Sequence, residues 1–221
     1  MGFLVGTSLL GYFFFLSFVF VSRLLYKRRM NIKYNSKNMF PFEFSYKTLF
    51  SESFYSHLFL ALSVASFITF FLTFDTSHKD GFLNFVMISG IINTLLIGAL
   101  FYTPLTNLRG HVAIASMFFT FLFLEIGAIM VASWRINQDE HTWNAVSGIW
   151  FSGFLLIVTF ALAMNPRLTL NFKAVEVVNE DGTKEYRRPK SVVLAFSEWI
   201  LIYIYLLSIL DIFLLKMQVN G

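Results

Sequence analysis

Two groups of polar side chains stand out in this 221-residue sequence, because they lie in or beside long apolar segments, where polar side chains are costly. The first group lies at or near the ends of such segments and consists of His57, Arg109, His111, Glu198 and Trp199. The second group lies within the segments and consists of Asn93, Glu125 and Asp211. Carboxyl, imidazole and guanidinium groups can pair across helices or hold the polar head of a ligand.

The two groups predict different roles. For the first group we consider a structural polar clamp between helices and, on the same residues, a site for a ligand, a lipid head group or a reaction. For Glu125 we expect a neutral side chain with one interhelical hydrogen bond, and its candidate partners are Asn93, Thr94 and Thr120. No second deep acid or buried lysine is expected beside it, so proton or ion transport is not favoured. Asp211 is expected to reach the membrane interface or Lys216 and to be structural.

Familiar enzyme signatures are missing from the sequence. It has no HExxH or GxSxG motif, no phosphate-binding glycine loop and no cysteine, and its four histidines lack metal-ligand spacing. We therefore predict no catalytic residue, no metal site and no cofactor. Two alternatives stay open on the same side chains. His57 and His111 could hold a haem between helices, and these two histidines with Glu52 and Glu198 could form a metal-dependent lipid hydrolase.

The composition indicates a membrane protein. Hydrophobic residues make up 57% of the chain and charged residues only 14%, whereas charged residues usually approach a quarter of a soluble domain. Six segments have about the 20 apolar residues that a membrane-spanning helix needs. They are 3–21, 57–74, 82–102, 111–132, 145–164 and 192–215. Because backbone groups must pair within a segment in lipid, we predict an all-α, polytopic bundle of six transmembrane helices forming one domain over residues 1–221.

Two connections are long enough to hold structure. In the segment 168–188, apolar and polar residues alternate around Asp181-Gly182, which predicts a small β-hairpin before the last helix. The first loop mixes aromatic and charged residues around Pro41, and we expect it to fold against the bilayer surface.

Lysine and arginine residues predict the orientation. If the loop 23–55 is cytoplasmic, alternation of the helices puts fourteen of the 17 basic residues on the cytoplasmic side. Both termini are then predicted on the non-cytoplasmic side. The basic residues lie in loops between apolar segments, so they are interpreted as topological signals and no nucleic-acid partner is expected.

Three stretches resemble a known family. The fourth segment reads GHVAIASMFFTFLFLEIGAIM, the sixth LAFSEWILIYIYLLSILDIF and the first loop FPFEFSYKTLFSESF. Together they resemble the six-helix membrane family of the damage-regulated autophagy modulators and the GPI-anchor lipid-remodelling proteins. The resemblance implies a six-helix fold and points to the residues His111, Glu198, Trp199, Pro41, Ser45 and Glu52. That family keeps its N-terminus in the cytoplasm, so we take the fold from the resemblance and the orientation from the charges.

Members of that family are implicated in processing or regulating membrane lipids, in autophagy and in modulating other membrane proteins. The leading prediction is thus a non-catalytic, multi-pass integral membrane protein that binds lipid and regulates lipid handling or a membrane partner. An accessory subunit of a larger membrane complex is the alternative from another class, with other membrane protein subunits as partners. A haem-binding or lipid-modifying membrane enzyme is the third.

Overall fold

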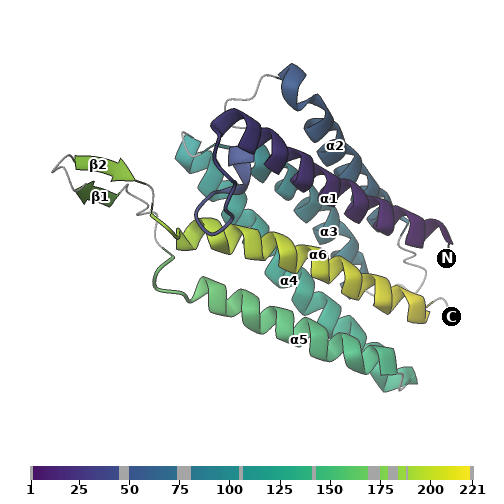
Figure 1. Cartoon of the computed structure of the whole chain (residues 1–221). Helices are drawn as coiled ribbons and strands as arrows, with labels where there is room; N and C mark the ends of the chain where they lie inside the picture. Colours follow the sequence, from purple (N-terminus) through teal and green to yellow (C-terminus); the bar gives the residue numbers. More distant parts are fainter. Residues whose placement is uncertain are drawn as a thin grey trace.

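The computed structural model describes residues 2–44, 50–73, 81–104, 107–140, 143–168, 175–178, 184–187 and 189–219. Six helices are long and apolar enough to cross a membrane: α1 (Gly2–Met30), α2 (Phe50–Leu72), α3 (Gly81–Tyr102), α4 (Leu108–Glu140), α5 (Trp143–Ala163) and α6 (Val193–Val219). Figure 1 shows them as one bundle with both chain termini at the same end. The predicted class, an all-α polytopic membrane protein, is confirmed.

Several helices are longer than the apolar segments that predict them. The first continues nine residues past the predicted end at position 21, because the stretch up to Met30 has no Gly or Pro. Its last turn carries Lys27, Arg28 and Arg29, whose charges interact favourably with the negative end of the helix dipole. Asn31, with a φ of 53°, adopts the left-handed conformation common just after a helix.

The hairpin predicted before the last helix is confirmed. Strand β1 (Val175–Val178) pairs antiparallel with β2 (Lys184–Arg187), with Val178 opposite Lys184. The pair projects from the bundle at the end away from the termini (Figure 1). The predicted turn at Asp181-Gly182 lies outside the described residues.

Close helix packing depends on small residues. The three most extensive helix contacts are those of α1 with α2, of α3 with α4 and of α4 with α5. One buried apolar cluster draws side chains from all six helices. A Cβ added at Gly90 of α3 would lie 2.1 Å from Cε1 of Phe71 on α2. A Cβ at Gly11 would lie 2.4 Å from the ring of Phe67. The two glycines therefore let α2 approach its neighbours more closely than any side chain would allow.

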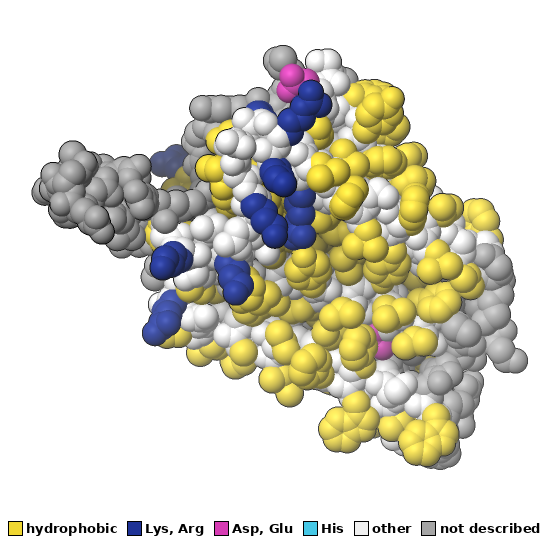
Figure 2. All heavy atoms as spheres, in the orientation of Figure 1, with side chains coloured by type: hydrophobic (Ala, Val, Ile, Leu, Met, Phe, Trp, Pro, Cys, Tyr) yellow, Lys and Arg dark blue, Asp and Glu magenta, His cyan; other side chains and the backbone are white. Residues whose placement is uncertain are grey.

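The surface suits a lipid environment. Large apolar side chains face outward along the helices; Trp150, for example, is 78% exposed and Ile157 is 70% exposed. Figure 2 shows hydrophobic side chains over the middle of the visible face and basic ones gathered towards the end that carries the hairpin. Exposed cations of that end are Arg23, Lys27, Arg28, Lys33, Lys37, Arg109, Arg167 and Lys190.

The first loop differs from its prediction. Residues 39–44 are buried, and they include the 3₁₀ turn η1 (Pro41–Phe44), which contacts α1, α3 and α6. The expectation that this loop lies on the bilayer surface is wrong for this part of it. Its apolar side chains fill the open end of the bundle, where Phe40 has no exposed surface at all. Burial of that aromatic surface is the driving force for this placement.

Candidate functional site

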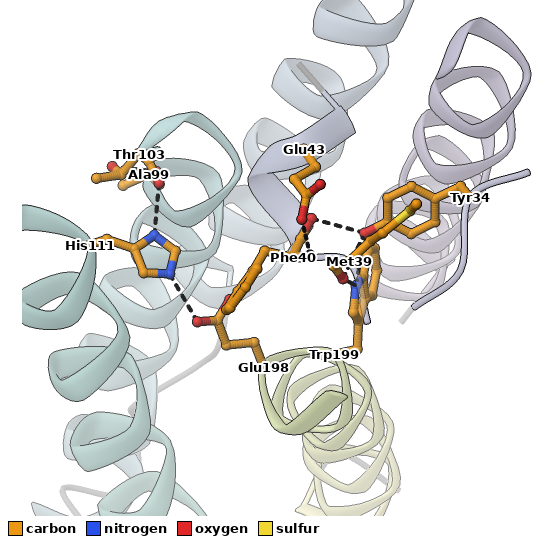
Figure 3. A network of polar contacts seen from close by, with 9 residues as sticks. All are labelled: Tyr34, Met39, Phe40, Glu43, Ala99, Thr103, His111, Glu198 and Trp199. Atoms are coloured by element: carbon orange, nitrogen blue, oxygen red, sulfur yellow. Dashed lines mark hydrogen bonds and ion pairs between the residues drawn. The ribbon is translucent and has the colours of Figure 1, made fainter. Parts of the chain in front are cut away.

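A histidine and a glutamate from two helices meet at the end of the bundle that carries the hairpin. Nε2 of His111, near the start of α4, lies 2.9 Å from Oε1 of Glu198, near the start of α6. Nδ1 of His111 lies 2.7 Å from the carbonyl oxygen of Thr103, just after α3 (Figure 3). Both side chains are buried, His111 at 1% exposure and Glu198 at 4%.

The carbonyl of Thr103 fixes one proton of this pair. A carbonyl oxygen only accepts, so Nδ1 of His111 must carry a hydrogen. The contact between Nε2 and Oε1 then contains one proton, which sits either on the imidazole or on the carboxyl group of Glu198. In both arrangements the pair has no net charge, and the second carboxyl oxygen, Oε2, is an acceptor. A neutral pair is the arrangement that burial in a membrane protein favours.

Glu198 borders a cavity of about 330 Å³ between α4, the end of α5 and the start of α6. Its Oε2 is buried and has no hydrogen-bond partner among the described residues. Apolar side chains supply most of the lining, namely Val112, Ala115, Phe119, Leu162, Ala163, Leu168, Leu194 and Leu201. Its polar lining comes from His111, Ser116, Thr120, Ser197 and Glu198. The cavity is therefore apolar along most of its wall, and Glu198 belongs to its polar side.

The buried part of the first loop covers this pair from the other side. The rings of Phe40 and Phe42 stand edge-on to the imidazole of His111, with centroids 6.0 and 5.5 Å away. Within the loop, the backbone N–H of Phe40 donates to Oε1 of Glu43 over 2.8 Å. Glu43 is buried as well, at 8% exposure, and lies within electrostatic range of Glu198. The loop thus adds both apolar cover and a second carboxyl group.

Trp199 fastens the loop to α6. Its indole N–H lies 3.0 Å both from the hydroxyl oxygen of Tyr34 and from the carbonyl oxygen of Met39 (Figure 3). The Tyr34 hydroxyl lies 2.9 Å from the carbonyl of Phe40 and 3.1 Å from that of Met39. Burial raises the pKa of Tyr34 well above its ordinary value, so the hydroxyl remains a donor. Trp199 is 1% exposed and therefore acts inside the bundle rather than at the membrane interface.

Two hydrogen bonds to backbone carbonyls also stabilise this end of the bundle. The N–H of Val192 donates to the carbonyl of Lys37 over 2.9 Å, and the side-chain amide of Asn38 donates to the carbonyl of Pro189 over 3.1 Å. They join the first loop to the segment that leads into α6. Residues more than 150 positions apart in sequence thus hold Glu198 in place.

Of the residues that the sequence analysis grouped together, the structure brings only some into contact. His57 lies on α2, where its ring nitrogens contact Ser53 Oγ at 2.8 Å and Tyr102 Oη at 2.6 Å. Arg109 is exposed at the start of α4. The structure thus splits the first group into a His111–Glu198–Trp199 centre and two outer residues, His57 and Arg109.

The haem and metal alternatives do not fit this geometry. A histidine ligand must present a free nitrogen lone pair to iron, yet both ring nitrogens of His57 and of His111 are engaged in hydrogen bonds. Within the part of the chain that the structure describes, no three His, Asp or Glu side chains gather where they could hold a metal ion. Glu52, the further ligand considered for a hydrolase, is exposed on α2.

Glu125 and Asn93 form a second polar pair, deep in the bundle. The side-chain amide of Asn93 on α3 donates to Oε2 of Glu125 on α4, and both residues have no exposed surface. This confirms Asn93 as the expected partner. Thr94 contacts the hydroxyl of Tyr205 on α6 instead.

The expectation that Asp211 reaches the membrane interface is wrong. Its side chain is 1% exposed and accepts a hydrogen bond from the hydroxyl of Ser152 on α5. The helix α6 continues to Val219, so Asp211 lies well inside the helix rather than at its end. The chain therefore does contain a second deep acid besides Glu125.

Sequence reasoning missed the partners that complete the His111–Glu198 centre. These partners are the main-chain carbonyls of Met39 and Thr103 and the hydroxyl of Tyr34. Contacts of this kind produce no recognisable sequence motif. Pro41 and Glu43 belong to the buried turn η1, and the aromatic run around them was the available signal. Ser45 lies outside the described residues. In comparisons with protein-family models, curated proteins and solved structures, nothing matched this chain.

Proposed function

We propose that this multi-pass membrane protein binds a neutral lipid in the cavity beside Glu198 and thereby regulates lipid handling or a membrane partner. The observation that supports the proposal is the position of Glu198 Oε2, a buried acceptor with no hydrogen-bond partner among the described residues. Glu198 lines a cavity whose wall is mostly apolar. A concave apolar surface with one well-placed polar group suits a molecule with an apolar body and a small polar head.

The proton positions define the class of head group. Since Oε2 accepts in either arrangement of the His111–Glu198 pair, the ligand must offer a donor such as a hydroxyl or an amide N–H. An anionic head without such a donor, for example a phosphate diester, would gain no bond there. Neutral hydroxyl lipids, such as diacylglycerols, sterols and ceramides, meet these requirements. A role in lipid handling also agrees with the resemblance to the autophagy-modulator and lipid-remodelling family.

The test removes the donor from the ligand and the acceptor from the protein. Purified protein in nanodiscs is titrated with a photoactivatable dioleoylglycerol, in competition with unlabelled dioleoylglycerol or its 3-methyl ether. One hydrogen bond to a charged or charge-sharing group is worth about 1.5 kcal/mol or more, so the ether should compete about tenfold less well. Glu198→Leu should abolish this difference, whereas Glu198→Gln should keep much of it, because the amide oxygen is still an acceptor.

A matched control is Glu52→Gln, which changes an exposed glutamate on α2. It should leave both competition curves unchanged. Equal competition by the alcohol and the ether in the unchanged protein would refute the donor requirement. Labelling that persists in Glu198→Leu with the difference intact would refute the site.

For the orientation we propose that the end carrying the exposed cations faces the cytoplasm, so that both termini lie on the other side. The chain has no cysteine, which makes single-cysteine labelling clean. In intact cells a membrane-impermeant maleimide should label Asp80→Cys, next to the start of α3, and not Lys37→Cys. The opposite pattern would reverse the orientation.

A further inference from the structure

A second cavity lies along the other half of α4. α4 residues between positions 111 and 120 line the cavity at Glu198, whereas residues between 123 and 135 line the second one. The start of α3 and one side chain of α5 complete it, and its volume is about 760 Å³. Its lining includes Phe82, Phe85, Leu124, Gly127, Val131 and Arg135.

Gly127 keeps the wall of this cavity open. A Cβ built at this position would meet no atom within 4 Å outside its own helix turn, in contrast to the crowded Gly90. The remaining lining is aromatic or aliphatic apart from Arg135. A cavity with this lining, at the depth of the membrane-spanning helices, would hold an acyl chain rather than water.

Arg135 places one positive charge at the end of the apolar wall. It follows the predicted end of the apolar segment at Ala132 by three residues and lies next to Trp134, which is 53% exposed. Its guanidinium carbon lies 4.6 Å from the centroid of Phe82 on α3. Trp and Arg at this distance from an apolar segment are typical of head-group depth. The contact with this ring holds the guanidinium beside the cavity, which both residues line.

We propose that this second cavity binds an anionic phospholipid of the leaflet on the side of the chain termini. One acyl chain lies against Gly127 and the surrounding apolar side chains, and the phosphate contacts Arg135. The guanidinium suits a phosphate because it can donate two parallel N–H bonds to two oxygens. This site rests on different residues from the cavity at Glu198, and it selects the opposite head-group chemistry.

The experiment measures lipid retention by native mass spectrometry of the full chain, released from nanodiscs that contain equal amounts of dioleoylphosphatidylglycerol and dioleoylphosphatidylcholine. The unchanged protein should retain the anionic lipid preferentially. Arg135→Gln should weaken its retention about tenfold, the equivalent of one charge-assisted bond. Gly127→Leu fills the cavity while the charge remains, and it should reduce retention of the anionic lipid to a similar degree.

Three comparisons make the result decisive. Arg109→Gln removes an exposed arginine from the other end of α4 and should leave retention unchanged. Arg135→Lys, which keeps the charge but loses the two-pronged geometry, should bind a few-fold less well and serves if the Gln variant fails to fold. Glycerol 3-phosphate, which has no acyl chains, should not compete. An unchanged lipid preference in both Arg135 variants, or full competition by glycerol 3-phosphate, would overturn the proposal.

Discussion

Replacing Tyr34 by phenylalanine tests how the first loop is held to the last helix. The change removes one hydroxyl group and keeps the ring, which packs edge-on against Tyr26 and Trp199 with centroids 5.3 and 6.0 Å away. The hydroxyl makes three contacts, as acceptor for the indole N–H of Trp199 and as donor towards the carbonyls of Met39 and Phe40.

The structure predicts a small loss despite these three contacts. Without the hydroxyl, the indole N–H of Trp199 still donates to the carbonyl of Met39. The carbonyl of Phe40 still accepts the backbone N–H of Glu43 over 3.0 Å. No buried group is left without a partner, so the cost is that of about one net hydrogen bond, about 1 kcal/mol. For a chain of this length that corresponds to a Tm lower by about 2–4 °C.

The shift in Tm is measured by heating the detergent-purified protein to a series of temperatures. Gel filtration then gives the fraction that is still folded at each temperature. Tyr55→Phe is the matched control, since Tyr55 is 67% exposed on α2 and its removal should change the Tm by less than about 1 °C. A Tyr34→Phe shift equal to that of the control would show that the hydroxyl does not hold the loop. A loss of about 3 kcal/mol or more would show that the alternative partners do not compensate.

Alkaline pH gives a second measurement on the same pair of proteins. Burial raises the pKa of Tyr34 in the folded protein above its ordinary value of 10.0. The unfolded chain therefore releases this proton first as the pH rises, so the stabilisation from Tyr34 is complete below about pH 10 and declines above it. The difference in stability between the unchanged protein and Tyr34→Phe should shrink above pH 10. A constant difference up to pH 11 would contradict this linkage.

Two further predictions concern the interior. Asn93→Leu should destabilise the chain more when Glu125 is present than in a Glu125→Leu background, and the coupling energy in a double-mutant cycle should be about 0.6–1.7 kcal/mol; a value of zero would refute the pair. Gly90→Ala should cost about 1–3 kcal/mol in thermal unfolding because the ring of Phe71 blocks the added methyl group. Gly98→Ala, whose nearest atom would lie at 3.5 Å, should not destabilise, and equal losses in the two variants would contradict the close approach.

The sequence was sufficient for the helices, because a bilayer leaves few options for a long apolar segment. Segment boundaries were less accurate, since helices continue into charged residues that hydropathy does not count. The hairpin and the pairing of Asn93 with Glu125 were also predictable, the first from local alternation and the second from the scarcity of polar partners at that depth. His111 and Glu198 could be placed on the same membrane side by counting helices.

The remaining parts depend on tertiary contacts that no local pattern encodes. His57 was expected near Glu198 because both lie at the same depth, but depth does not specify which helices are neighbours. Asp211 was assigned to the interface from its position in the segment, and the four extra residues of α6 together with Ser152 place it inside instead. The loop around Phe40 was misjudged because aromatic residues are equally common at interfaces and in cores.

The contacts between Lys37 and Val192, and between Met39 and Trp199, have a consequence for biosynthesis. A chain inserted from its N-terminus presents the first loop long before α6 leaves the ribosome. Until then the carbonyl of Met39 lacks its indole donor and His111 lacks its carboxyl partner. α6, which is made after the other five helices, thus completes the His111–Glu198–Trp199 centre, and a chain truncated before α6 would expose unpaired polar groups to membrane quality control.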